Sequence, residues 1–514
     1  MMPRWCVRTL LVAVLLSSNL VYLESLKGQF IWDDHNLVVK NEAIRDLAHP
    51  ATLFTRPSST SHRFVTNASL ALDYACWRLD PWGYHLTNLL LHGLATLLFA
   101  GLAYGLFGSP WVAFLAGLIF SLHPARAEAV AALLGRSDLL CTVFVLLAFL
   151  CHLRLRSRAE VWRLPSDRSL SRTRTCPRIG SGASSGPDPG SGIRGQLWQL
   201  GVLLAYGLAM GSKETGMMVF PLLVAYDRLV DLPAGRRSGR FWRERGPYYA
   251  LLALLALAYL YFRFWVPLPS PPAPARDLAL WEQYQSWHPS QALLTSFYLV
   301  AHYLGLLFFP WRLSNWYEIP RLAVPWDPRF LGSAALLLAL LGAALYAGKR
   351  ERRLSFLVAW FLLFLLPVLN LAAIPGAILA ERWLYLAGGS FCLLLGYGAV
   401  RGLRAPWMGR HWSLRPAGVA LVALVLALYA HQAREKSASW RTAVSLFAYS
   451  LQAYPDSAYL HFNLATAYYV EAKDTERTVA ELERAIQCDP RYLSLLTTLS
   501  ATPTSPPGAA PAGP

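Results

Sequence analysis

Apolar segments close to the length of a membrane-spanning helix recur along most of this chain. A helix needs about 20 mainly apolar residues to cross the hydrocarbon core of a bilayer. The chain is 55% hydrophobic and only 15% charged, whereas a soluble domain usually carries about 25% charged residues. The sequence therefore predicts an all-α polytopic membrane protein.

The hydropathy pattern predicts eleven spans, some of them short enough to need neighbouring helices to complete the crossing. They lie near 6–23, 86–107, 109–122, 138–153, 197–211, 216–230, 247–265, 331–347, 355–370, 384–400 and 416–431. The segment 291–309 is also apolar enough to cross, and the distribution of basic residues decides its interpretation.

More than half of the 47 Lys and Arg residues lie in the N-terminal segment and in the loops 154–196, 228–246, 348–354 and 401–415. The positive-inside tendency places these loops and the N-terminus in the cytosol. If 291–309 crossed the membrane, the later basic loops would lie outside the cytosol. We therefore interpret this segment as a surface-lying or re-entrant helix. The C-terminus is then non-cytosolic. The same clustering explains the net charge of +17 and argues against a nucleic-acid partner.

Two further sequence features bear on processing and metal binding. Arg4 and Arg8 precede the first apolar segment without a clear cleavage site after it, which predicts a retained signal anchor. The seven Cys form no CxxC pair. Neither a zinc site nor a disulfide framework is therefore indicated.

Composition divides the chain into a membrane domain (1–431), a helical segment (432–492) and a tail (493–514) rich in Ala, Pro and Gly that we expect to be disordered. Within the membrane domain, 24–85 is the first luminal loop. The cytosolic loop 154–196, rich in Arg, Ser, Gly and Pro, is also predicted to be disordered.

The segment 432–492 has helical periodicity and small residues where tetratricopeptide (TPR) helices interlock. Pro455 and Pro490 recur at close to the TPR period of about 34 residues. Since at least about three repeats are usually needed for stability, we expect this short segment to lean on the membrane domain or to be a truncated array.

Four polar motifs fall on the non-cytosolic side of this topology. They are Trp32-Asp33-Asp34-His35; the segment Leu122–Leu140 with His123, Glu128, Arg136 and Asp138; Lys213-Glu214; and Glu381-Arg382. Ionisable residues at membrane depth are costly and are candidates for function. Taken singly, each charged pair could be interfacial and solvated, and His123-Pro124 could simply end a helix. Their coincidence on one face favours a functional site, whereas Arg126 is interpreted as a surface residue.

A transferase acting on a lipid-linked sugar needs residues of these types. A carboxylate takes the proton of the incoming hydroxyl, Arg or Lys holds the departing phosphate, and an apolar groove holds the lipid. The sequence contains no Gly-rich loop of the P-loop kind, so ATP chemistry has no support.

The motifs "FIWDDHNLVVKNEAI", "LHPARAEAVAALLGRSDLL", "GSKETGMMVFPLLVAYD" and "LPVLNLAAIPGAILAERWLYL" occur in the order found in a known family. Over roughly 24–490 the chain resembles the transmembrane and TPR repeat-containing O-mannosyltransferases, and their bacterial membrane TPR relatives. The resemblance implies the GT-C glycosyltransferase fold. It also implies mannose transfer from dolichyl-phosphate mannose to Ser or Thr of secretory-pathway proteins, cadherin-type domains among them, in the endoplasmic reticulum membrane and without a required metal or cofactor.

The family's paired acids carry over to Asp33 and Asp34, which we expect to be catalytic. Arg382, supported by Lys213, is expected to contact the donor phosphate. The other expected donor-binding residues are His123, Glu128, Arg136, Asp138, Glu214 and Glu381. The sequon at Asn67 is a candidate glycosylation site.

The chain departs from the family in "SHRFVTNASLALDY", which keeps Arg63 but lacks the usual Pro, and in the Ala-Gly that follows its LYL motif. Three alternative functions remain open. They are a non-catalytic adaptor whose TPR segment binds a luminal protein, a bacterial enzyme that uses a polyprenyl-phosphate donor, and, with less support, a transporter.

Overall fold

The computed structural model describes residues 4–493 apart from 57, 59, 61, 157–191, 232–237, 270–287, 372–377 and 406–413, and all regular elements in these residues are helical. Helix α7 continues to Arg156 and α8 begins at Ile193, so the loop predicted at 154–196 is shorter at both ends. Its remainder, and the tail after residue 493, lie outside the described residues.

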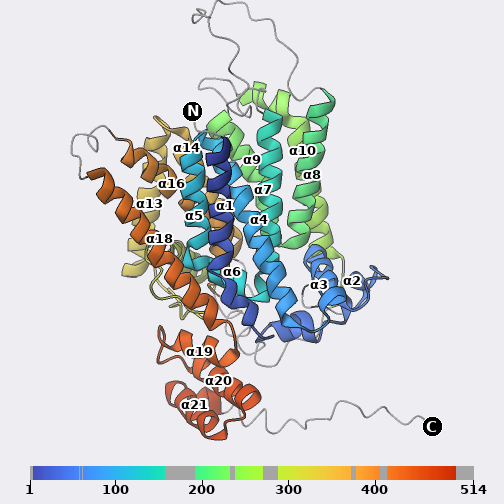
Figure 1. Cartoon of the computed structure of the whole chain (residues 1–514), viewed down its shortest axis with the longest axis vertical. Helices are drawn as coiled ribbons and strands as arrows, with labels where there is room; N and C mark the ends of the chain where they lie inside the picture. Colours follow the sequence, from blue (N-terminus) through green and yellow to red (C-terminus); the bar gives the residue numbers. More distant parts are fainter. Residues whose placement is uncertain are drawn as a thin grey trace, which may run out of the picture.

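The membrane region is a bundle of helices (Figure 1). Its helices are α1 (Arg4–Leu20), α2 (Thr52–Thr55), α3 (Phe64–Trp77), α4 (Pro81–Phe107), α5 (Pro110–Leu122), α6 (Ala127–Ala131), α7 (Arg136–Arg156), α8 (Ile193–Ser212), α9 (Val219–Tyr226), α10 (Ser238–Trp265), α12 (Pro289–Phe308), α13 (Pro328–Gly348), α14 (Arg352–Leu365), α15 (Leu384–Ala387), α16 (Gly389–Leu403) and α18 (Leu414–Ser439).

Seven helices in the described residues are long and apolar enough to cross a membrane, or eight if Glu381–Ala387 and Gly389–Leu403, bent by 56°, form one span. The chain is thus an all-α membrane protein, but the predicted count of eleven is not confirmed. Three predicted spans contain helices of only 13, 8 and 14 residues, namely α5, α9 and α14. Each of these short helices buries part of its surface against neighbouring helices.

Helix α12 is among the seven, and hydrogen bonds near its two ends tie it to other parts of the chain. Near its start, Ser296 Oγ donates to the Leu369 carbonyl at 2.6 Å. Shortly after its end, the Asn315 amide donates to Ser450 of the C-terminal helices at 3.1 Å. The seven residues from Phe308 to Asn315 reach at most about 25 Å, less than the roughly 30 Å of a hydrocarbon core. This short reach keeps the end of α12 near the C-terminal helices, but α12 is a candidate span by length and composition, so the surface-lying or re-entrant interpretation of 291–309 stays a prediction.

The connection between α4 and α5 shows how the sequence turns one helix directly into another. Gly108 has φ 64°, a left-handed conformation that favours glycine and ends α4. Ser109 then caps α5 by accepting from the Val112 amide, and Pro110 occupies the first helical turn. The two helices therefore lie antiparallel.

Three further helices, α19 (Ala443–Leu451), α20 (Ala458–Ala467) and α21 (Thr475–Cys488), stack beyond the bundle at the end opposite the N-terminus (Figure 1). We call this the α19 end and the opposite one the N-terminal end. The hydrophobic core of the stack includes Ile31 of the first loop and Trp316 of the α12–α13 connection. The rings of Trp316 and Tyr459 stack with centroids 3.9 Å apart. The C-terminal helices are thus packed onto the membrane region.

Helices α5 and α16 approach closely because small residues face each other. A Cβ added at Gly396 would lie 2.7 Å from the Ala116 amide nitrogen, whereas one added at Gly398, on the same helix, would meet nothing within 4 Å.

Replacing Gly396 by Val should push α5 and α16 apart and lower stability by about 1–3 kcal/mol, the usual effect of overpacking. The thermal midpoint of the purified protein in detergent should fall well below that of Gly398→Val, which makes the same chemical change at an open position. Equal midpoints for the two variants would contradict the close helix contact.

Candidate functional site

The first loop places Asp33 and Asp34 in different surroundings. Trp32 has φ 50°, which is uncommon outside glycine, and its ring packs against Phe447 of α19 with centroids 6.2 Å apart. Asp34 is buried and accepts from the Ile31 amide at 3.2 Å. Asp33 is partly exposed. Asp33 and Asp34 therefore differ in exposure, although they are adjacent in sequence.

The buried acid has an altered affinity for its proton. Burial raises the pKa of Asp34 to about 8, with the negative charge of Asp33 acting in the same direction and the Ile31 amide against it. Asp34 thus holds its proton at neutral pH and serves as a hydrogen-bonded turn residue. Asp33 is the acid of the pair that an external hydroxyl can reach.

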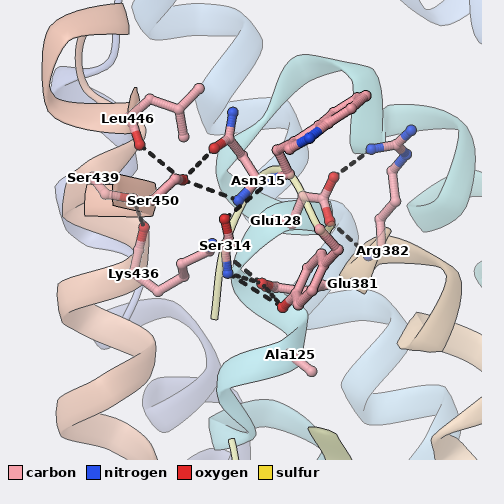
Figure 2. A network of polar contacts seen from close by, with 12 residues as sticks. Ala125, Glu128, Ser314, Asn315, Glu381, Arg382, Lys436, Ser439, Leu446 and Ser450 are labelled. Carbon is pink, nitrogen blue, oxygen red and sulfur yellow. Dashed lines mark hydrogen bonds and ion pairs between the residues drawn. The ribbon is translucent and has the colours of Figure 1, made fainter. Parts of the chain in front are cut away.

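Arg382 lies beside Glu128 of α6. Its guanidinium pairs with Glu128 Oε1, and its backbone amide donates to Oε2 at 2.9 Å, as Figure 2 shows. The Glu128 side chain is almost fully buried, whereas Arg382 keeps 15% of its side chain exposed. Arg382 is therefore not fully enclosed by protein.

Two further ion pairs continue from this one. Lys213, in the extended connection after α8, binds Asp138 in the first turn of α7 at 2.6 Å. The Arg63 guanidinium binds Glu214 at 2.9 Å. Lys213 and Asp138 are nearly buried, whereas Arg63 and Glu214 are partly exposed.

Charge–charge interactions over longer distances link these pairs into one group. Arg382 is attracted to Glu128, Asp138 and Asp33. Lys213 is attracted to Asp138 and repelled by Arg63 and Arg382. We call the group the charge cluster, and its members are Asp33, Arg63, Glu128, Asp138, Lys213, Glu214 and Arg382. It brings together six of the site residues that the sequence predicts. The seventh member, Arg63, stands out in the sequence only as a residue that the chain shares with the family motif.

Glu381 lies next to Arg382 in sequence but points away from the charge cluster. Its side chain is fully buried, 3.2 Å from Lys436 Nζ at the end of α18, and accepts from Tyr317 at 2.7 Å and from the Ser314 amide at 2.8 Å. Figure 2 shows this second network continuing through Asn315 to Ser450 of α19. Glu381 therefore anchors the C-terminal helices and is not placed to bind a donor.

Arg136 and His123 are likewise internal, contrary to the expectation that they bind the donor. Arg136 is fully buried and pairs with Asp73 at 2.8 Å, tying α7 to α3. His123 is also fully buried, with Nε2 3.0 Å from the Leu307 carbonyl oxygen. The polar atoms of both side chains bind other parts of the protein. Both residues therefore hold segments of the chain together.

Two other sequence-based interpretations are corrected. Asn67 is fully buried in α3 and its amide donates to the Thr60 carbonyl, so the folded chain does not present it for glycosylation. Arg126, interpreted as a surface residue, is fully buried and donates to the carbonyls of Leu384 and Tyr385. No local pattern in the sequence predicts the burial of Arg126, because its hydrogen-bond acceptors are backbone atoms more than 250 residues away in sequence.

An apolar groove lies between α12, α13, α14 and α16. Its volume is about 240 Å³, and its lining includes Leu307, Phe308, Leu340, Phe361, Phe391 and Leu394. Within the described ranges, no group of three or more His, Cys, Asp or Glu side chains is arranged to hold a metal ion.

No family model matches the chain, but curated proteins do. Mouse protein O-mannosyl-transferase TMTC4 is 28% identical over 499 residues, which cover 87% of this chain and 62% of the mouse protein. A Caenorhabditis elegans protein O-mannosyl-transferase is 27% identical, covering 95% of this chain and 63% of the worm protein. Human protein O-mannosyl-transferase TMTC1 is 27% identical, covering 94% and 55%.

The chain thus spans about six-tenths of the length of these relatives. Over shorter stretches the identity is higher, reaching 38% over 160 residues of a Xenopus laevis protein O-mannosyl-transferase, tmtc2. The resemblance predicted from the sequence motifs is therefore confirmed: the chain is similar over most of its length to the TMTC protein O-mannosyl-transferases.

Proposed function

We propose that this protein is a membrane-embedded glycosyltransferase of the GT-C class. It moves mannose from dolichyl-phosphate mannose to a Ser or Thr hydroxyl of a secretory-pathway protein, with cadherin-type domains as the acceptors implied by the resemblance. The names of its relatives support the reaction type. The observation that carries the proposal is that Asp33, a partly exposed carboxylate, and Arg382, a partly exposed guanidinium, interact electrostatically within one charge cluster.

The reaction divides between these two residues. The acceptor hydroxyl loses its proton to the Asp33 carboxylate as its oxygen bonds to the anomeric carbon of mannose. The bond from that carbon to the phosphate oxygen breaks, and its electron pair leaves with the lipid phosphate. Arg382 stabilises the added negative charge, because its planar fork offers two hydrogen bonds at once. Lys213 adds positive charge nearby.

The lipid and the orientation complete the proposal. The apolar groove between α12, α13, α14 and α16 takes part of the dolichyl chain. The protein lies in the endoplasmic reticulum membrane with its N-terminus cytosolic, so the α19 end and the charge cluster face the lumen. The C-terminal helices are a TPR-like segment that contacts a luminal protein or the acceptor.

Asp33→Asn should lower single-turnover mannosyl transfer at least ~100-fold, since a positioned base typically contributes about 10²–10⁴-fold. The matched control is Asp46→Asn, an exposed acid of the same loop that pairs with His49, and its rate should match the wild type. Membrane insertion and abundance should not change in either variant. A wild-type rate in Asp33→Asn would exclude Asp33 as the base and favour the non-catalytic adaptor function.

Arg382→Lys keeps the charge but loses the bidentate fork, so we expect kcat/KM for the lipid donor to fall about 10-fold or more. Arg329→Lys makes the same change at an exposed pair with Asp327 and should leave kcat/KM unaltered. Unchanged donor use in Arg382→Lys and also in Arg382→Ala would remove Arg382 from the reaction.

The pKa of Asp34 predicts how stability depends on pH. Because its pKa in the folded chain is about 8, the folded protein holds a proton that the unfolded chain releases above its ordinary pKa near 4. Stability should therefore fall as pH rises between about 4 and 8. Asp34→Asn mimics the protonated acid, so the decline in thermal midpoint from pH 5 to 8.5 should be smaller in this variant. Parallel declines in both proteins would contradict the buried, protonated state.

A further inference from the structure

A second groove lies at the N-terminal end of the bundle, away from the charge cluster, and is formed by α5, α16 and α18. It consists of two adjoining cavities of about 380 and 340 Å³ that share Val400 and Arg404. The first is lined by Phe107, Ser109, Val112, Tyr397, Val400, Arg401, Arg404 and Ala405. The second is lined, apart from Arg404, by apolar residues: Trp111, Phe114, Leu115, Leu118, Val400, Leu403, Val419, Val422, Ala423 and Leu426.

The polar part of the groove is lined by two arginines, Arg401 and Arg404. Arg401 donates to the Tyr397 hydroxyl at 2.8 Å, and neither cavity is lined by an Asp or Glu of the described residues. The following segment, 405–415, contains no acidic residue in its sequence. Glu351, which also contacts the Tyr397 hydroxyl, lies 3.9 Å from a different arginine, Arg353. Arg401 and Arg404 are both exposed and remain available to an anion.

The apolar part of the groove faces lipid. Helix α18 is long and apolar enough to cross the membrane, and only 6% of its apolar stretch is buried inside the protein. Trp111, 41% exposed at the start of α5, is of the type that marks the membrane–water boundary. In Figure 1 the nearby ends of α16 and α18 lie at the end of the bundle where the chain begins. The two arginines therefore stand at headgroup level, and the apolar cavity runs from them into the hydrocarbon.

We propose that this groove binds an anionic glycerophospholipid. Its phosphodiester and headgroup charge lie against Arg401 and Arg404, and one acyl chain lies between α5, α16 and α18. The guanidinium fork suits phosphate oxygens, and each basic residue near a membrane surface favours an anionic lipid by about fivefold. Two arginines predict a preference of roughly 30-fold over a zwitterionic lipid. The site is independent of the transferase reaction, because it shares no residue with the charge cluster.

Native mass spectrometry of the purified full chain tests this proposal, with phosphatidylserine and phosphatidylcholine of identical acyl chains competing for binding. Phosphatidylserine should be retained about 30-fold more strongly, and Arg401→Gln combined with Arg404→Gln should abolish the preference. The matched control combines Arg350→Gln with Arg352→Gln, which removes the same charge near the same end of the bundle outside both cavities. This control should keep the preference.

A second pair of variants tests the acyl chain. Ala423→Trp fills the apolar cavity and should weaken binding of both lipids, whereas Ala427→Trp, at an exposed position on the same helix outside the cavity, should not. Equal retention of the two lipids by the wild-type protein would overturn the proposal. So would full displacement by water-soluble glycerophosphoserine, since the groove would then be a simple anion site.

Discussion

The ion pair between Arg382 and Glu128 holds together parts of the chain that are 254 residues apart. A buried carboxylate such as Glu128 is costly unless it is paired and hydrogen-bonded, and here both oxygens bind the same arginine residue, one through the guanidinium and one through the backbone amide. Removing one partner of such a pair typically costs about 3–5 kcal/mol. The pair therefore fixes where the turn Glu381–Trp383 lies against α6, and with it the place of the charge cluster.

The neighbouring Glu381 ties the same turn to a different part of the molecule. Glu381 binds Lys436 of α18, while Arg382 binds Glu128 of α6. Successive residues thus connect the end of α18, which leads into the C-terminal helices, and the charge cluster through one short 3-10 turn. The first loop adds a third connection, because Trp32 packs on Phe447 of α19 directly before Asp33. The position of Asp33 therefore depends on how the C-terminal helices dock.

Much of this could be predicted from the sequence, and the failures have physical causes. Motif order and loop charge single out Asp33, Glu128, Asp138, Lys213, Glu214 and Arg382, which the fold brings into one charge cluster, and their roles stay predictions. The predicted count of eleven spans is not confirmed, since α5, α9 and α14 are apolar yet short. The sequence predicts a surface position for Arg126 and donor binding for Arg136, but both residues are buried. Helix packing sets their partners, and no local sequence pattern encodes that packing.

The central claim is that Asp33 and Arg382 act on opposite sides of one sugar–phosphate bond. The most direct measurement is a cryo-electron microscopy structure of the full chain with a non-transferable mannosyl phosphonate lipid. The account predicts the phosphonate oxygens within about 3 Å of the Arg382 guanidinium, with the anomeric carbon facing Asp33. A phosphonate bound elsewhere, with Arg382 still paired only to Glu128, would contradict it.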